Sequence, residues 1–372
     1  MFGRLRHHFA NERGQVLVFV VGLLPVIIGM GGMAVDIGQY ASARRDMQKA
    51  ADSIALAAAQ DLPDTTAART SGQTWASNYG LGASEYTLTI TGGTTAPNAK
   101  VVITRSHSFT FMRFVGISSR SVGANATAVK ASFGGSNGIV PWSVLQTTVD
   151  HSTSGAEVTL KYDATGENIG NFGAIRIDGP GASIYNTSAK YGSTSFACAA
   201  TAPNCTTGAC PGIYPTTCDE NAPDCDGPDC TPQTGNLIGP TATAVDFRMN
   251  NTSLSCDTFA EAFGTPDASG KYHLANACNP WIDGPGKCAT NTSICSRRVL
   301  VIPVVSDFGN GASDPATILR FALVYLEGYE SGKCQGNNCD IQAHFVNADV
   351  DTSAIAGAYD ATALVHFVRL SQ

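Results

Sequence analysis

Residues 13–60 read RGQVLVFVVGLLPVIIGMGGMAVDIGQYASARRDMQKAADSIALAAAQ, and this stretch decides the fold of the chain. The run 16–35 holds no charged residue, and about 20 apolar residues are enough for a helix to cross a hydrocarbon core of about 30 Å. Beyond Asp36 strong helix formers dominate, and no proline interrupts them before Pro63. The stretch therefore predicts one helix of about 45 residues, membrane-spanning over 16–35 and amphipathic over 36–62.

Two other classes of segment also contain long apolar runs. A cleaved secretory signal has a shorter apolar core and ends in a small-residue cleavage site, whereas this run leads through VDIGQY into further helix. A buried core helix of a soluble protein seldom holds an uncharged run of this length. The sequence therefore favours a membrane anchor over both.

Two sets of residues on this helix are candidates for helix packing. Ala34, Gly38 and Ser42 form a ladder of small residues at four-residue steps, which allows close approach of a second helix. Ordinary membrane-helix composition also produces such ladders. Apolar residues recurring at three- and four-residue steps form the second set: Ile37, Tyr40, Met47 and Ile54. Asp36 either marks the water boundary or pairs with a neighbouring subunit.

The cysteines indicate the compartment. None belongs to a C-x-x-C pair, a spacing that structural zinc sites usually contain. An even number of cysteines in loops rich in Gly, Pro and Asn instead predicts disulfide bonds, which persist in oxidising compartments. The predicted disulfide-bonded residues are Cys198, Cys205, Cys210, Cys218, Cys225, Cys230, Cys256, Cys278, Cys288, Cys295, Cys334 and Cys339. Their pairing stays open, with the sequence-local pairs Cys205/Cys210, Cys225/Cys230, Cys288/Cys295 and Cys334/Cys339 favoured. Everything after the span is thus expected outside the cytoplasm, and the basic tail 1–15 inside.

The rest of the chain is strand-rich, and the predicted fold class is α+β. Residues 63–135 are expected to form a small α+β unit, with a short helix near Trp75 and a helical turn at 111–116. The Gly/Ser-rich stretch 132–138 predicts a linker. Residues 136–372 are expected to form a β-rich, sandwich-like domain stapled by disulfides, with a cysteine-rich insert at about 198–235. The predicted strands are 86–91, 100–110, 121–131, 156–163, 173–178, 298–306, 319–330, 340–347 and 362–370.

Three motifs are candidates for chemistry. Ser136 lies in a G-x-S-x-G pattern, but a nucleophile elbow needs a helix after it, so a linker is favoured. D-x-S-x-S, a metal-coordinating pattern, is formed by Asp150, Ser152 and Ser154, but a predicted strand follows, which favours a polar turn. The acidic loop 218–230 offers oxygen ligands for Ca²⁺ without EF-hand spacing. Its candidate ligands are Asp219, Asp224, Asp226 and Asp229.

Further phrases carry a resemblance to a known family. The strongest are RGQVLVFVVGLLP at 13–25 and AVDIGQYASARRDMQKAADSIALAAAQ at 34–60. Fainter ones are SRSVGANATAV at 119–129, GIVPWSV at 138–144, GNFGAIRIDG at 170–179, GNLIGPT at 235–241 and RRVLVIPVVSDFGNG at 297–311. With these phrases the chain resembles TadG-like proteins of the bacterial Tad (tight adherence, Flp pilus) assembly system. A prepilin needs Glu at the fifth position after its cleavage-site Gly, but Phe19 stands there after Gly14. The resemblance therefore implies an uncleaved anchored relative with a pilin-like α+β unit, rather than a major pilin.

The sequence and this resemblance together predict a non-enzymatic, single-pass protein of the bacterial inner membrane that takes part in Flp pilus assembly. Its expected partners are membrane lipid and pilin-like or Tad machinery proteins, and a homo-oligomer stays open. A net charge of −7 argues against nucleic acid, whose binding needs a basic face. No cofactor is expected apart from the Ca²⁺ of the alternative function, a Ca²⁺-dependent surface adhesin. An exported hydrolase is a third class, with weaker motifs.

Overall fold

The long apolar and amphipathic stretch near the N-terminus forms one continuous helix, α1 (Gln15–Gln60), as its sequence predicts. The structure is a computed structural model that describes residues 15–93, 96–161, 171–200, 229–230, 232–250, 256–267, 270–280, 296–308, 316–330, 332, 334, 339–349, 355–357, 359, 363 and 365–371. The chain divides into two compact units. Unit 1 comprises 1–91, 98–128 and 370–372, and unit 2 comprises 92–97 and 129–369.

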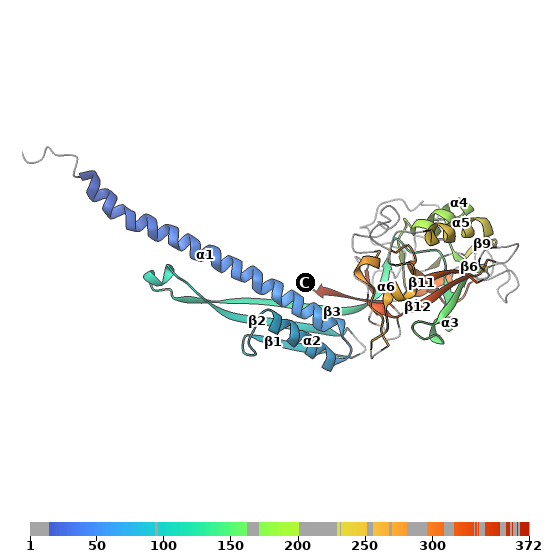
Figure 1. The fold of residues 1–372 in the computed structure, drawn as a ribbon, viewed down its shortest axis with the longest axis horizontal. Helices are drawn as coiled ribbons and strands as arrows, with labels where there is room; N and C mark the ends of the chain where they lie inside the picture. Colours follow the sequence, from blue (N-terminus) through green and yellow to red (C-terminus); the bar gives the residue numbers. More distant parts are fainter. Residues whose placement is uncertain are drawn as a thin grey trace, which may run out of the picture. The chain divides into compact units, whose positions relative to one another are not determined.

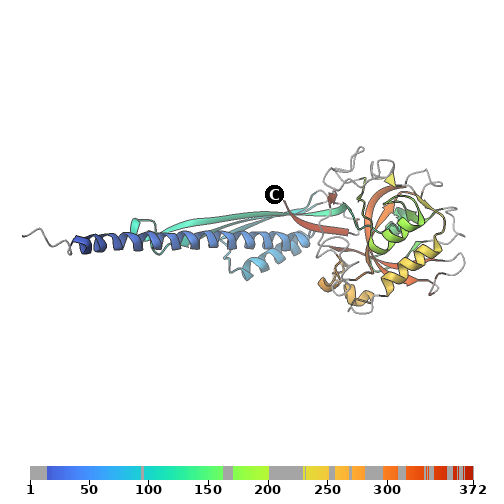
Figure 2. The same ribbon diagram turned by 90° about the horizontal axis from the view of Figure 1, so that it is seen from above.

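Unit 1 is built on the second half of α1. A cis Leu62–Pro63 peptide follows α1, and Asp64 then caps α2 (Thr65–Asn78) by accepting hydrogen bonds from two backbone N–H groups of its first turn. Figures 1 and 2 show α2 lying beside the last turns of α1. Gly72 permits this close packing, because a Cβ there would lie 2.6 Å from Leu88 Cδ2 and 3.2 Å from Ala58 Cβ.

The sheet of unit 1 contains β1 (Tyr86–Thr91), β2 (Asn98–Ser108) and β3 (Ser119–Ser136), in that order. β1 and β2 are antiparallel, with Tyr86 opposite Ile103. The short 3₁₀ helix η2 (Met112–Val115) joins β2 to β3, and Figure 1 shows this hairpin running back along α1.

The core of unit 1 is made mainly of small side chains, which lets the helices and the sheet approach closely. The α1 contribution is Ala50, Ala51, Ile54, Ala55, Ala57, Ala58 and Ala59. Alternate residues of β2 and β3 face this core, as a half-buried sheet requires: Ala99, Val101, Ile103, Val122, Ala124, Ala126 and Ala128. The predicted helix, strands and helical turn of this unit are all observed.

The predicted linker at 132–138 is wrong for most of its length. Residues 132–136 are the end of β3, where every residue is buried. Gly135 is needed there because a Cβ would lie 2.5 Å from the Ala197 carbonyl oxygen of the neighbouring strand β7 (Ala197–Cys198). Glycine therefore serves close backbone packing at this position rather than flexibility. The two compact units divide earlier, between Ala128 and Val129.

Unit 2 contains a mostly antiparallel sheet of six strands in the order β4-β10-β11-β12-β5, with β8 paired to β11. Its strands are β4 (Val144–Leu145), β5 (Glu157–Lys161), β8 (Asp229–Cys230), β10 (Val299–Val305), β11 (Ala316–Tyr329) and β12 (Ile341–Val346). The end of β3 begins a second group with β7, β13 (Ala348–Asp349), β14 (Ile355–Gly357) and β15 (Val365–Ser371), and β6 (Asn171–Ile175) pairs with β9 (Pro232–Thr234).

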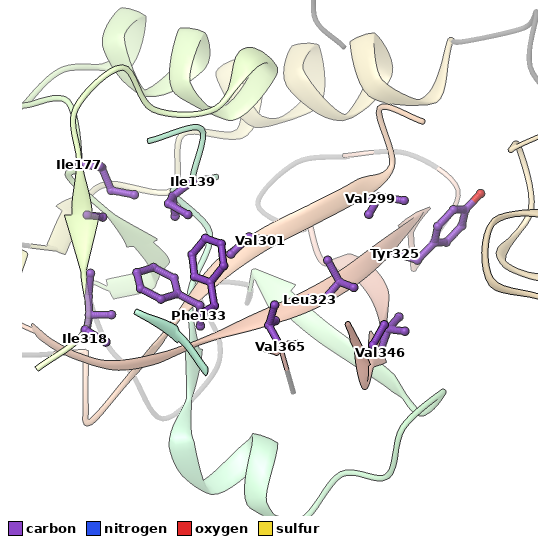
Figure 3. Packing of buried hydrophobic residues seen from close by; sticks show 14 of the residues in the cluster. Phe133, Ile139, Ile177, Val299, Val301, Ile318, Leu323, Tyr325, Val346 and Val365 are labelled. Atoms are coloured by element: carbon purple, nitrogen blue, oxygen red, sulfur yellow. The ribbon is translucent and has the colours of Figure 1, made fainter. Parts of the chain in front are cut away.

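Two hydrophobic cores lie on opposite faces of the six-stranded sheet, because alternate residues of β10 and β11 point to opposite sides. One core contains Val301 and Leu323 together with Phe133 and Val365 of the second strand group, as Figure 3 shows. The other contains Ile302 and Val324 together with residues of α4 (Ala182–Tyr191) and α5 (Ile238–Met249). Burial on both faces explains why β10 is apolar throughout.

The long strands of unit 2 were predicted from the sequence, but its helices were not. These are α3 (Gln146–Asp150), α4, α5 and α6 (Phe259–Phe263). α4 contains Asn, Thr and two Ser residues, and α5 contains Gly, Pro and two Thr residues, all of which have weak helix propensity. They form because each buries one face on the sheet and on the other helix.

Candidate functional site: the N-terminal helix and its hairpin

The first half of α1 exposes a continuous apolar surface. Among the residues that the structure describes, α1 is the one helix long and apolar enough to cross a membrane. Large side chains along this half are half or more exposed: Phe19, Val20, Val21, Leu23, Leu24, Val26, Ile27, Ile28, Met30, Val35 and Ile37. Pro25 lies inside the helix, where a membrane helix tolerates it.

One face of α1 is occupied by the chain's own sheet. The Tyr40 hydroxyl donates a hydrogen bond to the Ser121 carbonyl at 3.1 Å, and the Tyr40 ring lies 6.0 Å from the rings of His107 and Phe109. Ile54 is fully buried, and Met47 is half-buried. The sequence analysis grouped these side chains with Ile37 as one packing face for partners, but in the fold they serve contacts within unit 1.

The opposite face of α1 remains exposed. Ala34, Gly38 and Ser42 all lie on it, and a Cβ placed on Gly38 meets no atom within 4 Å. Ile37 is 59% exposed beside them. The fold therefore separates the predicted packing residues into an inner set and an outer set. We call the outer set, Ala34, Ile37, Gly38 and Ser42, the outer strip.

Asp36 lies at the boundary between the apolar half and the packed half, and it is fully buried. Its carboxylate accepts three backbone hydrogen bonds from the β2–β3 hairpin. Thr110 N–H donates at 3.1 Å, and the N–H groups of Phe111 and Met112 both donate at 2.7 Å. A carboxylate is a strong acceptor for such N–H groups. Asp36 therefore fastens the hairpin to the helix, a role that the sequence analysis did not assign to it.

Gly32 lies one turn before Asp36 and completes this attachment. A Cβ at Gly32 would lie 2.5 Å from two atoms of the Phe111 ring, so only glycine leaves room for the ring against the helix backbone. The sequence analysis did not assign a role to Gly32 or Phe111. The glycine cluster of the span is the one feature of the sequence that could have indicated this close contact. It is a weak signal, because glycines are frequent in membrane helices in general.

An ion pair stabilises the start of β1, next to the Tyr86–Ile103 pair. Arg105 donates to both carboxylate oxygens of Glu85, at 2.7 and 2.8 Å, and Gly82 N–H donates at 2.8 Å. The hydrogen bonds from Arg105 are the main reason that the pKa of Glu85 falls from 4.5 to about 2. Glu85 therefore stays ionised down to strongly acidic pH.

The D-x-S-x-S residues of unit 2 take part in ordinary structural contacts. Asp150 ends α3 and pairs with Arg320 of β11. Ser152 Oγ donates to the Thr148 carbonyl at 2.7 Å, and Ser154 Oγ accepts from Asn347 N–H at 2.9 Å. Among the described residues no group of three or more His, Cys, Asp or Glu side chains is placed to hold a metal ion.

The calcium and nucleophile predictions have different outcomes. Asp219, Asp224 and Asp226 lie outside the described residues, and only the backbone of Asp229 is described, in β8, so the calcium loop stays a prediction. Ser136 is the buried last residue of β3. It lies opposite Ala197 in the short antiparallel pairing of β3 with β7. A strand end paired in this way is not the strand–turn–helix geometry of a nucleophile elbow.

Disulfide bonds occur where the sequence analysis expected them in the described part of the chain. Cys334 and Cys339 are joined, as the local spacing predicted, and Cys256 is joined to Cys278 with 5.7 Å between their Cα atoms. Cys198 is also disulfide-bonded. The remaining predicted disulfide residues, Cys205, Cys210, Cys218, Cys225, Cys288 and Cys295, lie outside the described residues, and of Cys230 only the backbone is described.

A buried polar network joins segments that are distant in the sequence. The Trp142 indole N–H donates to the Tyr185 hydroxyl at 2.8 Å, and this hydroxyl lies 2.9 Å from Thr241 Oγ1. Burial raises the pKa of Tyr185 to about 12, so the hydroxyl stays protonated. Three of the fainter phrases, at 138–144, 170–179 and 235–241, meet here, because Ser143 N–H also donates to the Gly173 carbonyl at 2.6 Å.

These features define the class of the protein. It is an α+β protein. Among the described residues one helix could span a membrane, and this helix continues into a unit in which helices pack on a sheet. A β-rich unit with disulfide bonds follows in the chain. Residues 14–61 match the family model described as putative Flp pilus-assembly TadE/G-like, so this segment is TadE/G-like, as the resemblance indicated. The matched residues contain all of α1 and every residue of the outer strip. No curated protein and no solved structure matches the chain.

Proposed function

We propose that this chain is a non-enzymatic, membrane-anchored accessory component of Flp pilus assembly. The first half of α1 crosses the bacterial inner membrane, with the basic tail in the cytoplasm and the rest of the chain exported. The outer strip of α1 packs against a helix of a pilin-like subunit or of the Tad secretion machinery. Unit 2 is then a periplasmic or extracellular interaction domain.

The observation that carries this proposal is the division of α1 into an occupied and an unoccupied face. Tyr40, Ile54 and the alanines around them fill the inner face, so the sheet leaves no room for a partner there. The outer strip lies on the opposite face within the segment that matches the pilus-assembly family. Small residues at four-residue steps let a second backbone approach closely, which is the usual basis of helix association in lipid.

The disulfide bonds support the proposed orientation. Cys256–Cys278 and Cys334–Cys339 both lie in unit 2, on the C-terminal side of the candidate span. Disulfide bonds persist in the periplasm and outside the cell and are rare in the cytoplasm. An exported unit 2 places the short N-terminal tail on the cytoplasmic side of a single span.

The test is a pair of leucine substitutions in the outer strip. Ala34→Leu with Gly38→Leu should abolish pilus assembly, because the new side chains keep a partner helix several ångströms away. Gly22→Leu is the matched control: a Cβ there also meets nothing within 4 Å, but the residue lies outside the strip. A photocrosslinker at Ile37, which is exposed, should capture the partner in the wild-type background and lose it in the double variant.

Two readouts make the outcome decisive. Pili on the cell surface are counted by electron microscopy, and the amount of protein in the membrane fraction is measured in parallel. Normal pili in the double variant, with normal protein levels, would refute helix-mediated assembly. Loss of pili in the Gly22→Leu control as well would show that added bulk in the span, rather than the strip, is responsible.

A further inference from the structure

The connection between β2 and β3 exposes large apolar side chains outside the candidate span. We call residues 109–118 the hairpin tip. Phe114 is 84% exposed, Val115 62%, Ile117 43% and Phe111 36%. Single exposed apolar residues are common on protein surfaces, but several of them gathered at one turn indicate an interaction surface.

The hairpin tip is a hydrogen-bonded turn that contains η2. Phe109 N–H donates to the Ser118 carbonyl at 2.9 Å and closes the hairpin beneath the tip. Gly116, with φ of 89°, reverses the chain after η2, a conformation that favours glycine. Hydrogen bonds thus hold the backbone of the tip in one turn, on which Phe114 and Val115 are exposed.

The hairpin tip is fixed at a known level on α1. Asp36 binds the N–H groups of 110–112, and Gly32 receives the ring of Phe111. Gly32 and Asp36 enclose the last turn of the uncharged run 16–35. At about 1.5 Å per residue, the Phe111 ring lies about 5 Å inside the C-terminal end of that run.

The backbone of the hairpin tip is suited to a water-poor environment. Groups that leave water need internal hydrogen-bond partners. Asp36 satisfies three N–H groups of the tip. Four more donate to carbonyl groups within it, at 2.9 to 3.1 Å: Phe109 to Ser118, Phe114 to Phe111, Gly116 to Arg113 and Ile117 to Met112. Seven of the ten backbone N–H groups of the tip thus have an internal acceptor, which lowers the cost of moving the tip from water into lipid.

The charges near the tip favour a lipid surface over a purely apolar partner. Arg113 lies within the tip and Arg120 just after it, and both are exposed. Arginine beside apolar residues can bury its stem while its guanidinium binds headgroup phosphates. No acidic residue stands between Arg105 and Arg120, so no neighbouring carboxylate in that stretch repels the headgroups.

We propose that the hairpin tip is a second membrane contact, a wedge that inserts Phe114, Val115 and Ile117 into the interface of the leaflet on the C-terminal side of the span. This inference rests on the proposed function in one respect, that α1 crosses the bilayer. The wedge makes the orientation of unit 1 to the membrane rigid, because α1 and the hairpin then enter the same leaflet at two points joined by Asp36.

The experiment uses the full-length protein reconstituted in vesicles of phosphatidylcholine and phosphatidylglycerol, with or without brominated acyl chains. Bromine quenches tryptophan fluorescence only within the bilayer. Three variants each add one tryptophan to the same background of three native ones. Phe114→Trp reports on the tip, Ile28→Trp on the span, and Val102→Trp on β2, about 23 Å along the strand from the tip.

All three positions are exposed, so each variant is expected to fold. We expect quenching at positions 28 and 114 and none at 102. Quenching at 28 without quenching at 114 overturns the wedge and leaves the anchor intact. Absence of quenching at 28 overturns the anchor itself, and the wedge with it. Equal quenching at 102 and 114 also overturns the wedge, because the whole sheet would then lie on lipid.

One further pair of variants separates lipid from protein as the occupant. Arg113→Glu with Arg120→Glu, in the Phe114→Trp background, should reduce quenching in vesicles containing phosphatidylglycerol. If a second copy of this chain covers the tip instead, position 114 is unquenched and its emission shifts to the blue as the protein-to-lipid ratio rises. That result overturns the proposal.

Discussion

Removal of the Asp36 carboxylate should release the hairpin tip from α1 while the rest of unit 1 stays folded. Asp36→Ala leaves the N–H groups of 110–112 without their acceptor in a buried position. A hydrogen bond to a charged group shifts an equilibrium by about ten- to a hundredfold. Exchange of these three amides with solvent deuterium should therefore accelerate by at least about tenfold each.

Asp36→Asn gives a graded result, because asparagine keeps one acceptor oxygen. With that oxygen in place of Oδ2, it still accepts from Phe111 and Met112, but its NH₂ group faces the Thr110 N–H. Exchange at 110 should match that of the alanine variant, and exchange at 111–112 should be intermediate. Asp46→Asn, an exposed position on the same helix, should change none of them.

The measurement is hydrogen–deuterium exchange by mass spectrometry on the full-length protein in one detergent. The peptide that covers 109–118 is fragmented by electron transfer, so that uptake at amide 110 is separated from uptake at 111–112. Peptides from β1 and from the start of β2 report whether the sheet remains intact. Wild-type exchange of the tip in Asp36→Ala, with an intact sheet, would refute the attachment. Equal acceleration across the whole sheet would show that Asp36 supports unit 1 globally.

Other predictions follow from single contacts. Gly72→Leu should destabilise unit 1 by about 1–3 kcal/mol in chemical denaturation, since the new side chain would overlap both Leu88 and Ala58, and no loss of stability would contradict that packing. Tyr185→Phe should lower the free energy of unfolding by about 2–4 kcal/mol in the same assay, because it leaves the Trp142 indole N–H and the Thr241 hydroxyl without their shared partner. The control Tyr191→Phe, at an exposed position, should have little effect. The depressed pKa of Glu85 contributes stability that is present above its unfolded value near 4.5 and lost as pH falls towards 2. Glu85→Gln should therefore flatten the acid dependence of the unfolding midpoint in that window, and an unchanged dependence would disprove the contribution.

The division of α1 into faces also changes how partners should be sought. The sequence predicts Tyr40 on the same partner-facing apolar face as Ile37, but in the fold it faces the chain's own sheet and bonds to Ser121. A crosslinker there would capture the chain itself. Ile37, three residues earlier, faces outward and is the better probe.

The sequence by itself determined the elements whose signal is local. The uncharged run 16–35 and the helix formers after it specify α1. Alternation specifies β1 and β2, and short apolar runs specify the long strands of unit 2, because period and composition act within a few neighbouring residues. Cysteine spacing likewise predicted the Cys334–Cys339 bond.

Only the tertiary structure decided the features that depend on distant residues. Asp36 reads as a simple boundary charge until the hairpin brings three N–H groups from 74 to 76 residues away. Gly135 reads as a linker glycine until β7 packs against it, and α4 and α5 have too little intrinsic helix propensity to be foreseen without the sheet that they cover. Local sequence determines helix and strand propensity and hydrophobic pattern. Which side chains are buried, and which groups they contact, depends on which distant segments pack together in the folded chain.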